Sequence, residues 1–340
     1  MSIFNDFLAW AGESEEAVDV VGTEYNKTVV DTETTTEEIE LLEETREIKT
    51  ISPFELDDIE ILKIDKDPYD QIQKEINNNR SVPLTTSTKY VSGVDNGEVC
   101  KEKLLKDDVY KTYVALMVNS NCNPDKKARY NYIYDNKFKD VQDMLYFEKQ
   151  VYTTDENGKK VKAFITKLDV NGDPVKNQKG EDVKIYIKEA VKVSNKTFNN
   201  HIKKLQEVGL MEPVEGNKGA YKLYFEDNSK YYKTIPYPIL EELLLNTNSK
   251  IVKLYAVLSY MLDTKRFKQM DRAFLCRCTG MSTGDRQKHE MSLALRTLAK
   301  LGLIQIGRVE VPGVKTPLEY RLCTLNEWQN YNKNIIKKIS

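Results

Sequence analysis

Histidine is scarce in this chain, and its scarcity excludes several classes of DNA-processing enzyme. Only two histidines, His201 and His289, occur among the 340 residues. A nickase of the His-hydrophobe-His type needs two histidines one residue apart, and a tyrosine recombinase needs a His-x-x-Arg box, whereas the chain offers "HIKK" and "HEMS". The Gly-x-x-x-x-Gly-Lys-Ser/Thr loop that cradles ATP phosphates is also missing. We therefore expect a binding protein that is not an enzyme and uses no cofactor.

Long apolar runs and a zinc-type cysteine pattern are missing as well. No stretch approaches the length of a membrane span, and we expect no signal peptide because the first residues lack a basic segment and a continuous apolar run. The five cysteines are typical of a reducing cytoplasm. Cys276 and Cys278 lack a second ligand pair at useful spacing, which favours a buried structural pair over a metal site. We expect a cytoplasmic protein with no membrane partner.

The formal net charge is only −2, but the charge is distributed unevenly. Residues 1–70 hold 21 acidic and 5 basic residues, a net charge of −16, while the remainder holds 32 acidic and 46 basic residues, a net charge of +14. Positive charge outside the first 70 residues is what phosphate binding requires. The acidic stretch has few aromatic residues and too much charge for a compact core, so we expect residues 1–98 to be a largely disordered arm. The end of this arm, from "NNNRSVPLTTSTKY" to "GVDNGEV", is expected to be linker.

A short apolar helix is expected at the start of this arm, in "SIFNDFLAW". A disordered tail of this kind can fold when it docks into a groove on another protein. It can also fold back on its own domains, whereas a membrane surface is disfavoured because anionic lipid attracts Lys and Arg. An acidic tail that mimics DNA is a further hypothesis. The expected partner-binding residues are Ile3, Phe4, Phe7, Leu8 and Trp10.

The stretch "VSNKTFNNHIKKLQEVGL", residues 193–210, predicts an amphipathic helix with a binding face. Ser194 is a favourable N-cap, and Phe198, Ile202 and Leu205 fall on one side at about 100° per residue. The other side carries Asn and Lys side chains, which bond base edges and phosphates. The alternative is a solvated helix face with no ligand. The candidate DNA-binding residues here are Ser194, Asn195, Lys196, Thr197, Asn199, Asn200 and Lys203.

The flanking segments suggest the rest of a small domain. Upstream, "IYIKEAVKV" predicts a short helix, and downstream "GLMEPVEGNKGAYKLYF" predicts two strands around a polar tip that contains Lys218. This run of about 45 residues resembles winged helix-turn-helix domains, in particular through its "S..T....L..L...GL(I/M)" spacing. The resemblance implies DNA binding through the second helix and the wing.

Residues 248–323 repeat the same order, and internal repetition strengthens the interpretation of both copies. "LAKLGLI" matches "LQEVGLM", and the first helices align, with Lys111 and Tyr113 matching Lys253 and Tyr255. In the second binding helix Met291, Leu295 and Leu298 form the expected buried face, although about five extra residues after Ser282 depart from the family spacing. The candidate DNA-binding residues of this copy are Arg286, Lys288, His289, Ser292, Arg296 and Lys315.

The expected fold is mainly α with small β wings, an α+β protein of two winged-helix domains. The first covers residues 99–228 and contains a β-hairpin insertion at about 150–186, and the second covers residues 229–340 with a C-terminal helix. The lysine-rich insertion either lies along DNA, pairs with another subunit or has no binding role. The last helix places Trp328, Tyr331 and Ile335 on one side, to pack on the body or to form a homodimer contact.

Two winged helices in one chain resemble the plan of plasmid and phage replication initiators. The resemblance implies a bacterial, nucleoid-associated or mobile-element-encoded protein that binds double-stranded DNA at an origin and recruits a replication or transcription protein through its N-terminal helix. The first alternative is a transcriptional regulator of a mobile element. The second is a protein-interaction scaffold whose winged helices no longer touch DNA.

Overall fold

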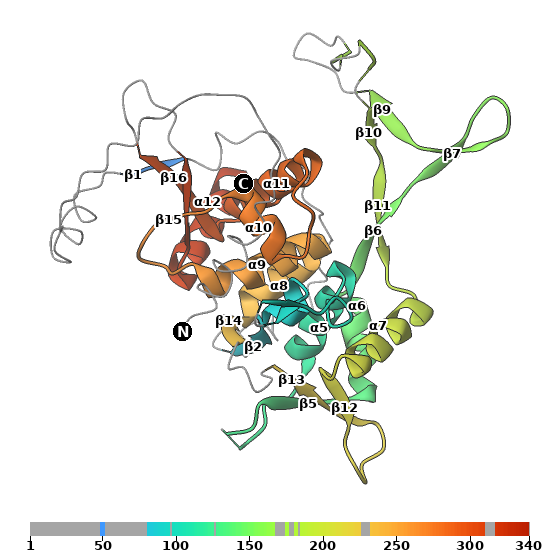
Figure 1. The fold of residues 1–340 in the computed structure, drawn as a ribbon, viewed down its shortest axis with the longest axis vertical. Coiled ribbons are helices and arrows are strands. Elements are labelled where there is room, and N and C mark those ends of the chain that lie inside the picture. The colour runs from blue at the N-terminus through green and yellow to red at the C-terminus, as the bar shows by residue number, and fades with distance from the viewer. Residues whose placement is uncertain are drawn as a thin grey trace.

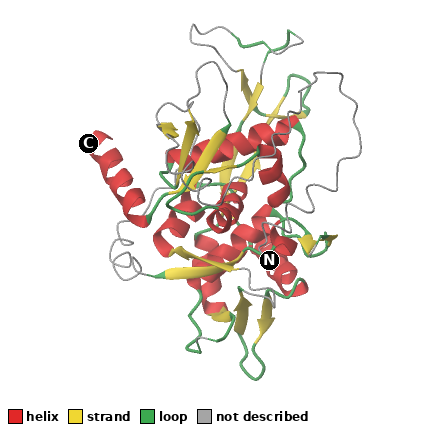
Figure 2. Ribbon diagram, turned by 60° about the vertical axis from the view of Figure 1, so that its left-hand side comes forward, coloured by secondary structure: helices red, strands yellow, loops and turns green. Residues whose placement is uncertain are grey.

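The protein is of the α+β class, with helices at its centre and most strand pairs at its margins (Figure 1, Figure 2). The computed structural model describes residues 48–51, 80–95, 97–125, 127–166, 174–176, 180–182, 184–225, 232–309 and 317–339. The expected α+β class is confirmed, with a larger share of strand than the phrase "small β wings" implies, because the insertion is built of strands.

The first structural unit follows the order helix, strand, helix, helix, strand, strand. Its three strands form an antiparallel sheet in which the strand nearest the N-terminus lies at one edge, and its helices pack together on α5. A 3-10 turn, η2 (Asp135–Lys137), leads into the second helix. The elements are α5 (Asp107–Asn119), β5 (Tyr130–Tyr134), α6 (Phe138–Asp143), α7 (Asn195–Glu207), β12 (Met211–Pro213) and β13 (Ala220–Tyr224).

The second unit repeats this order and this sheet. Its strands run β16-β17-β15, which matches β12-β13-β5 in the first unit. The repetition read from the sequence is therefore a repetition of structure. The elements are α9 (Ser249–Met261), β15 (Lys268–Gln269), α10 (Arg272–Cys278), α11 (Asp285–Lys300), β16 (Ile304–Val309) and β17 (Leu318–Leu322).

The two units pack against each other through their first helices, α5 and α9. These helices are buried almost throughout, and they include the lysines matched in the sequence: Lys111 is 0% exposed and Lys253 is 2% exposed. The Nζ atom of Lys111 donates to the carbonyl oxygen of Thr247 at 2.7 Å, and that of Lys253 donates to the carbonyl oxygen of Leu105 at 2.9 Å. The matched lysines thus fasten one unit to the other.

The insertion is a branched β structure, called the arm below. Its stem pairs β6 (Tyr146–Gln150) with β11 (Lys188–Lys192), and Figure 1 shows it projecting from the body beside α7. The expected hairpins are present, but the paired region spans residues 146–192, beyond the expected 150–186. The two branches pair β7 (Tyr152–Thr154) with β8 (Lys160–Lys162), and β9 (Phe164–Thr166) with β10 (Lys184–Tyr186).

The helix predicted in "IYIKEAVKV" is wrong, because this segment forms β10 and β11. Ala190 and Val191 pair with Glu148 and Phe147 of β6, so a strand partner some 40 residues away in the chain overrides the local helical spacing. The helix that precedes α7 in the unit is α6, which lies before the arm. The arm is consequently inserted in the connection between α6 and α7.

Part of the N-terminal segment 1–98, which the sequence predicted to be largely disordered, belongs to the folded body. The prediction that residues 80–98 are linker is wrong: Val82 and Leu84 are fully buried, and the Tyr110 hydroxyl donates to the Thr85 carbonyl oxygen at 2.8 Å. Residues 48–51 also form a strand, which pairs with β16. The elements are β1 (Ile48–Ile51), β2 (Ser81–Thr85), α4 (Thr88–Val91), β3 (Val94–Asp95) and β4 (Glu98–Val99).

Two more elements complete the connection between the units. The strand β14 (Tyr232–Pro236) pairs with β2, and the helix α8 (Tyr237–Asn246) follows and packs on α5 and α9. Residues 1–47 and 52–79, which include the expected partner-binding helix, lie outside the described residues.

The C-terminal helix α12 (Leu325–Ile339) packs on the second unit. Trp328 is buried, and the Tyr331 hydroxyl donates to the carbonyl oxygen of Lys300 at 2.8 Å. These contacts favour packing on the body over a dimer contact for this side of the helix.

Candidate nucleic-acid interface

The position of α7 is fixed at its first turn and along its buried face. The Ser194 hydroxyl accepts a hydrogen bond from the Thr197 amide at 3.2 Å, which confirms the predicted N-cap. Phe198, Ile202 and Leu205 are buried as expected, and the Phe198 ring meets that of Phe138 on α6 with centroids 5.5 Å apart. A rigid helix with one solvent-facing side is the result.

Polar contacts join α7 to the other two helices of its unit. The Gln142 side-chain amide of α6 donates to the side-chain oxygen of Asn195 at 3.1 Å. On the α5 side, the Thr112 hydroxyl lies 2.8 Å from His201 Nδ1, and burial lowers the pKa of His201. His201 therefore serves the packing of α7.

The predicted binding residues of α7 separate into two groups. Ser194 and Thr197 bond each other, and Asn195 is engaged by Gln142, so these three side chains shape the start of the helix. The remaining four are exposed on one face, about one helical turn apart, and carry amide and ammonium donors. These four, called the α7 face below, are Lys196, Asn199, Asn200 and Lys203.

The predicted wing residue of the first unit is also exposed. Lys218 lies in the turn between β12 and β13, and Gly219 beside it has φ +83, a backbone conformation that favours glycine. A Cβ atom at Gly219 would lie 2.6 Å from an Asp135 carboxylate oxygen, so the turn is closely packed on the strand end. In the second unit the corresponding Lys315 lies outside the described residues.

The helix α11 is a weaker candidate for DNA binding than α7. Its buried face of Met291, Leu295 and Leu298 is as predicted. Arg286 and His289 are exposed, but the Arg286 Nε atom lies 3.2 Å from a Glu290 carboxylate oxygen. A carboxylate within the polar face offsets its positive charge. Among the other predicted residues, the Ser292 hydroxyl accepts from Arg272 at 3.2 Å, and three are half-buried: Lys288, Ser292 and Arg296.

The turn before α11 is shorter than the extra residues after Ser282 suggest, so its departure from the winged-helix spacing is small. The helix begins at Asp285, directly after its cap Gly284, so most of the five extra residues after Ser282, "TGDRQ", are already helical. Gly280 has φ +74, and a Cβ atom there would lie 3.0 Å from Leu104. The turn of the second unit is therefore pressed against the first unit.

The stem of the arm ends in a closed three-way junction of backbone hydrogen bonds. The Val151 amide donates to Ile187, the Ile187 amide to Ala163 and the Ala163 amide to Val151, at 3.1, 3.0 and 2.9 Å. The Gln150 side-chain amide donates to all three carbonyl oxygens, at 2.9 Å to Val151 and Ile187 and 3.4 Å to Ala163. These bonds hold the two branches at a set angle to the stem.

Sequence reasoning missed the residues that the branches expose. Tyr152, Phe164 and Tyr186 are 47%, 41% and 51% exposed, and a lysine ammonium lies over each ring. The signal was the alternation of Lys and aromatic residues in "KVKAFITK" and "KIYIK", which marks a strand with one Lys/aromatic face.

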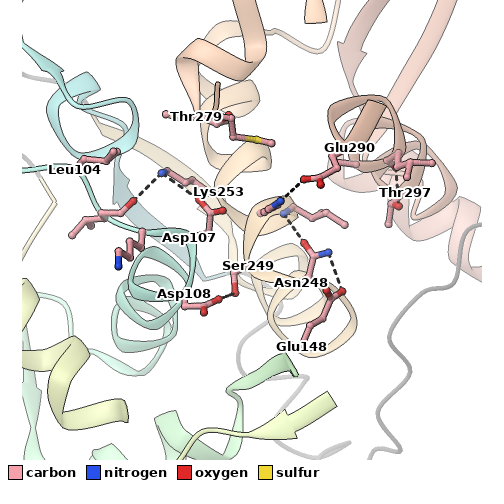
Figure 3. Close-up of a pocket in the computed structure, with 18 of the residues that line it drawn as sticks. Leu104, Asp107, Asp108, Glu148, Asn248, Ser249, Lys253, Thr279, Glu290 and Thr297 are labelled. Atoms are coloured by element: carbon pink, nitrogen blue, oxygen red, sulfur yellow. Dashed lines mark hydrogen bonds and ion pairs between the residues drawn. The ribbon is translucent and has the colours of Figure 1, made fainter. Parts of the chain in front are cut away.

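A cavity of about 700 Å³ lies at the seam between the two units (Figure 3). Two of its polar contacts cross the seam: Lys253 Nζ lies 3.4 Å from Asp107, and the Ser249 hydroxyl donates to Asp108 at 2.5 Å. Lys250 and Glu290, at its other end, pair within the second unit. We assign the two crossing pairs to the contact between the units.

The cysteines and the acidic residues give no metal centre in the part of the chain that the structure describes. All five cysteines are free, and burial raises the pKa of Cys276. Cys276 and Cys278 are fully buried on α10, which confirms the expected buried pair. None of the helices within the described ranges is long and apolar enough to cross a membrane.

Comparisons with protein-family models, curated protein sequences and solved structures give no significant match to this chain.

Proposed function

We propose that this protein is a sequence-specific double-stranded DNA-binding protein, in which each of the two units acts as a winged helix. The observation that carries the proposal is the α7 face: four exposed Asn and Lys side chains on a helix that is fastened from behind by α5 and α6. Asn bonds adenine bidentately, and Lys reaches guanine or phosphate. A helix held in this way fits the major groove.

The repeated architecture supports a two-site contact. The order helix, strand, helix, helix, strand, strand occurs twice, and α7 and α11 occupy the same place in it. Figure 1 places these helices on either side of the α5–α9 pair. Two readers joined rigidly fit a site composed of two half-sites, with α7 supplying most of the base contacts.

Within this class we favour a replication initiator or replisome organiser of a plasmid or phage, which binds an origin and recruits a partner through the N-terminal segment. The net charge of +14 beyond residue 70 supports the DNA contact. The N-terminal apolar segment, with its acidic tether, supports recruitment. Repression of a promoter remains the alternative use of the same DNA contact.

Nuclease footprinting on DNA from the replicon that encodes the protein tests the proposal. We expect a protected region with two parts. Lys196→Ala with Asn199→Ala removes protection of one part, and Arg286→Ala with His289→Ala weakens the other. A footprint that neither variant alters would contradict the assignment of the two helices. Replication of a plasmid carrying the protected fragment then separates an origin from an operator.

A further inference from the structure

We propose that the arm carries a second nucleic-acid site, for an unpaired DNA strand. The site is one face of its two branches, called the arm face: Tyr152, Lys160, Lys162, Phe164, Lys184 and Tyr186. The inference rests on the proposed function, because the duplex contact of α7 is what brings the arm to DNA.

Strand register places these six side chains on one face of each branch. Tyr152 pairs with Lys162 and Thr154 with Lys160 across the first branch. Phe164 pairs with Tyr186 across the second branch, and Lys184 is two residues from Tyr186 on the same strand. Side chains of paired residues, and of residues two apart, point to the same side of a sheet.

Ring contacts join the two branches into one continuous face. The Lys162 ammonium, on the first branch, lies 5.7 Å from the Tyr186 ring centroid on the second. Tyr186 and Phe164 meet edge to face with centroids 6.4 Å apart. At the two ends of the arm face, the Lys160 ammonium lies 4.8 Å from the Tyr152 ring centroid and the Lys184 ammonium lies 4.3 Å from the Phe164 ring centroid.

The charge and the shape of this face select the ligand. The four branch strands contain three lysines and no acidic residue, while the aliphatic Val161 and Ile165 fall on the opposite face. Three half-exposed rings interleaved with ammonium groups offer stacking for bases and charge for phosphates. Because the bases of a duplex already stack on each other, only an unpaired strand presents base faces to these rings.

The position of the face also fits this ligand. The stem pairs five residues of β6 with five of β11, so it is about 17 Å long, and it separates the branches from the start of α7. This distance corresponds to roughly 5 base pairs along a duplex. A strand separated from the duplex next to the α7 contact would therefore reach the arm face.

Binding of the full chain to a thymidine oligonucleotide of about 15 nucleotides tests the proposal. The matched probe is an abasic oligonucleotide of the same length. We expect the thymidine strand to bind tightly and the abasic strand at least 10-fold more weakly. The variant Tyr152→Ala, Phe164→Ala, Tyr186→Ala should lose at least about 20-fold in affinity for thymidine, given what a stacked base contributes. Val161→Ala with Ile165→Ala, on the opposite face, is the control and should bind as the wild type does.

The lysines are tested separately through salt. Replacing Lys160, Lys162 and Lys184 by Gln should reduce the slope of log affinity against log salt by about 2 for the single strand. Equal binding of thymidine and abasic strands, or an unchanged affinity in the three-ring variant, would overturn the proposal. The proposal would also be overturned if the three-ring variant lost self-association but kept single-strand binding, because the arm face would then bind a second copy of the protein.

Duplex binding distinguishes failure of this inference from failure of the proposed function. The three-ring variant should keep the wild-type duplex affinity, and the variants of the α7 face should keep single-strand affinity. Ring-dependent single-strand binding in a protein that binds no duplex would support the arm site and reject the duplex proposal. Duplex binding without ring-dependent single-strand binding would reject the arm site alone.

Discussion

Lys111 and Lys253 are equivalent residues that cross-bind the two units. Each is the fifth residue of the first helix of its unit, and each donates to the carbonyl oxygen two residues before the other unit's first helix. The contact between the units therefore has approximate two-fold symmetry within a single chain. It fixes α7 and α11 relative to one another, which a two-part DNA site requires.

Removing either lysine should destabilise the whole chain. Lys111→Met leaves the Thr247 and Tyr146 carbonyl oxygens without their ammonium donor, and each buried unpaired acceptor costs about 1–3 kcal/mol. We expect a decrease of about 2–4 kcal/mol in the free energy of unfolding, measured by urea denaturation. Lys203→Met, on the exposed side of α7, is the control and should stay within about 0.5 kcal/mol of the wild type.

The same lysine gives stability a pH dependence in the alkaline range. Burial lowers the pKa of Lys111 to about 8, against about 10.4 in an unfolded chain. The unfolded state therefore binds more protons between these values, and the free energy of unfolding rises with pH there. From pH 7 to 9.5 the wild type should gain about 2 kcal/mol relative to Lys111→Met.

Urea denaturation of both proteins at the two pH values measures this gain. The range stops below pH 10 because burial raises the pKa of Tyr110 and Tyr113, whose contribution to stability is lost above the ordinary tyrosine pKa. An unchanged difference between wild type and variant would show that Lys111 titrates as it does in water.

The Gln150 side chain should control the rigidity of the arm. Gln150→Ala removes the donor shared by three junction carbonyl oxygens, while the backbone ring of hydrogen bonds remains. We expect faster hydrogen exchange at the Val151, Ala163 and Ile187 amides, by about 5- to 10-fold for the loss of about 1 kcal/mol. Hydrogen exchange in α5 is the control and should not change. If the junction amides of the variant stay as protected as in the wild type, the backbone hydrogen bonds alone hold the junction.

The acidic N-terminal segment should weaken DNA binding. Residues 1–47 contain 14 acidic and 2 basic residues, a net charge of −12, and their deletion leaves β1 in place. We expect the truncated protein to bind duplex DNA more tightly, with a gain that shrinks as salt rises, because the repulsion is electrostatic. Equal affinity at low salt would dismiss DNA mimicry and leave partner docking as the role of the segment.

Sequence patterns correctly predicted those elements whose structure depends on residues close to one another in the chain. The cap at Ser194, the buried faces of α7 and α11, and the internal repeat follow from helical spacing and short turn signals. The α7 face could be predicted for the same reason. Its binding role stays a prediction.

Contacts between distant residues account for what the sequence did not reveal. Val191 reads as helical but pairs with Phe147, and Val82 reads as linker but pairs with Ile235 of β14. The arm face depends on two branches that meet only in three dimensions, so the sequence could not place its lysines and rings on a common face, and local spacing put Tyr186 in a helix. The sequence aligned Lys111 with Lys253 as equivalent positions of a repeat, but it did not show that each lysine bonds the other unit.

Sequence-specific duplex binding is tested by fluorescence anisotropy of the full chain with labelled duplex fragments of its own replicon, titrated with salt. We expect one fragment to be bound well above the others, with log affinity falling steeply in log salt. Lys196→Ala, Asn199→Ala and Lys203→Ala together should abolish that preference, at about 1–3 kcal/mol for each base contact, without unfolding the chain. Equal and weak binding of every fragment at low salt, unaffected by the three substitutions, would contradict it.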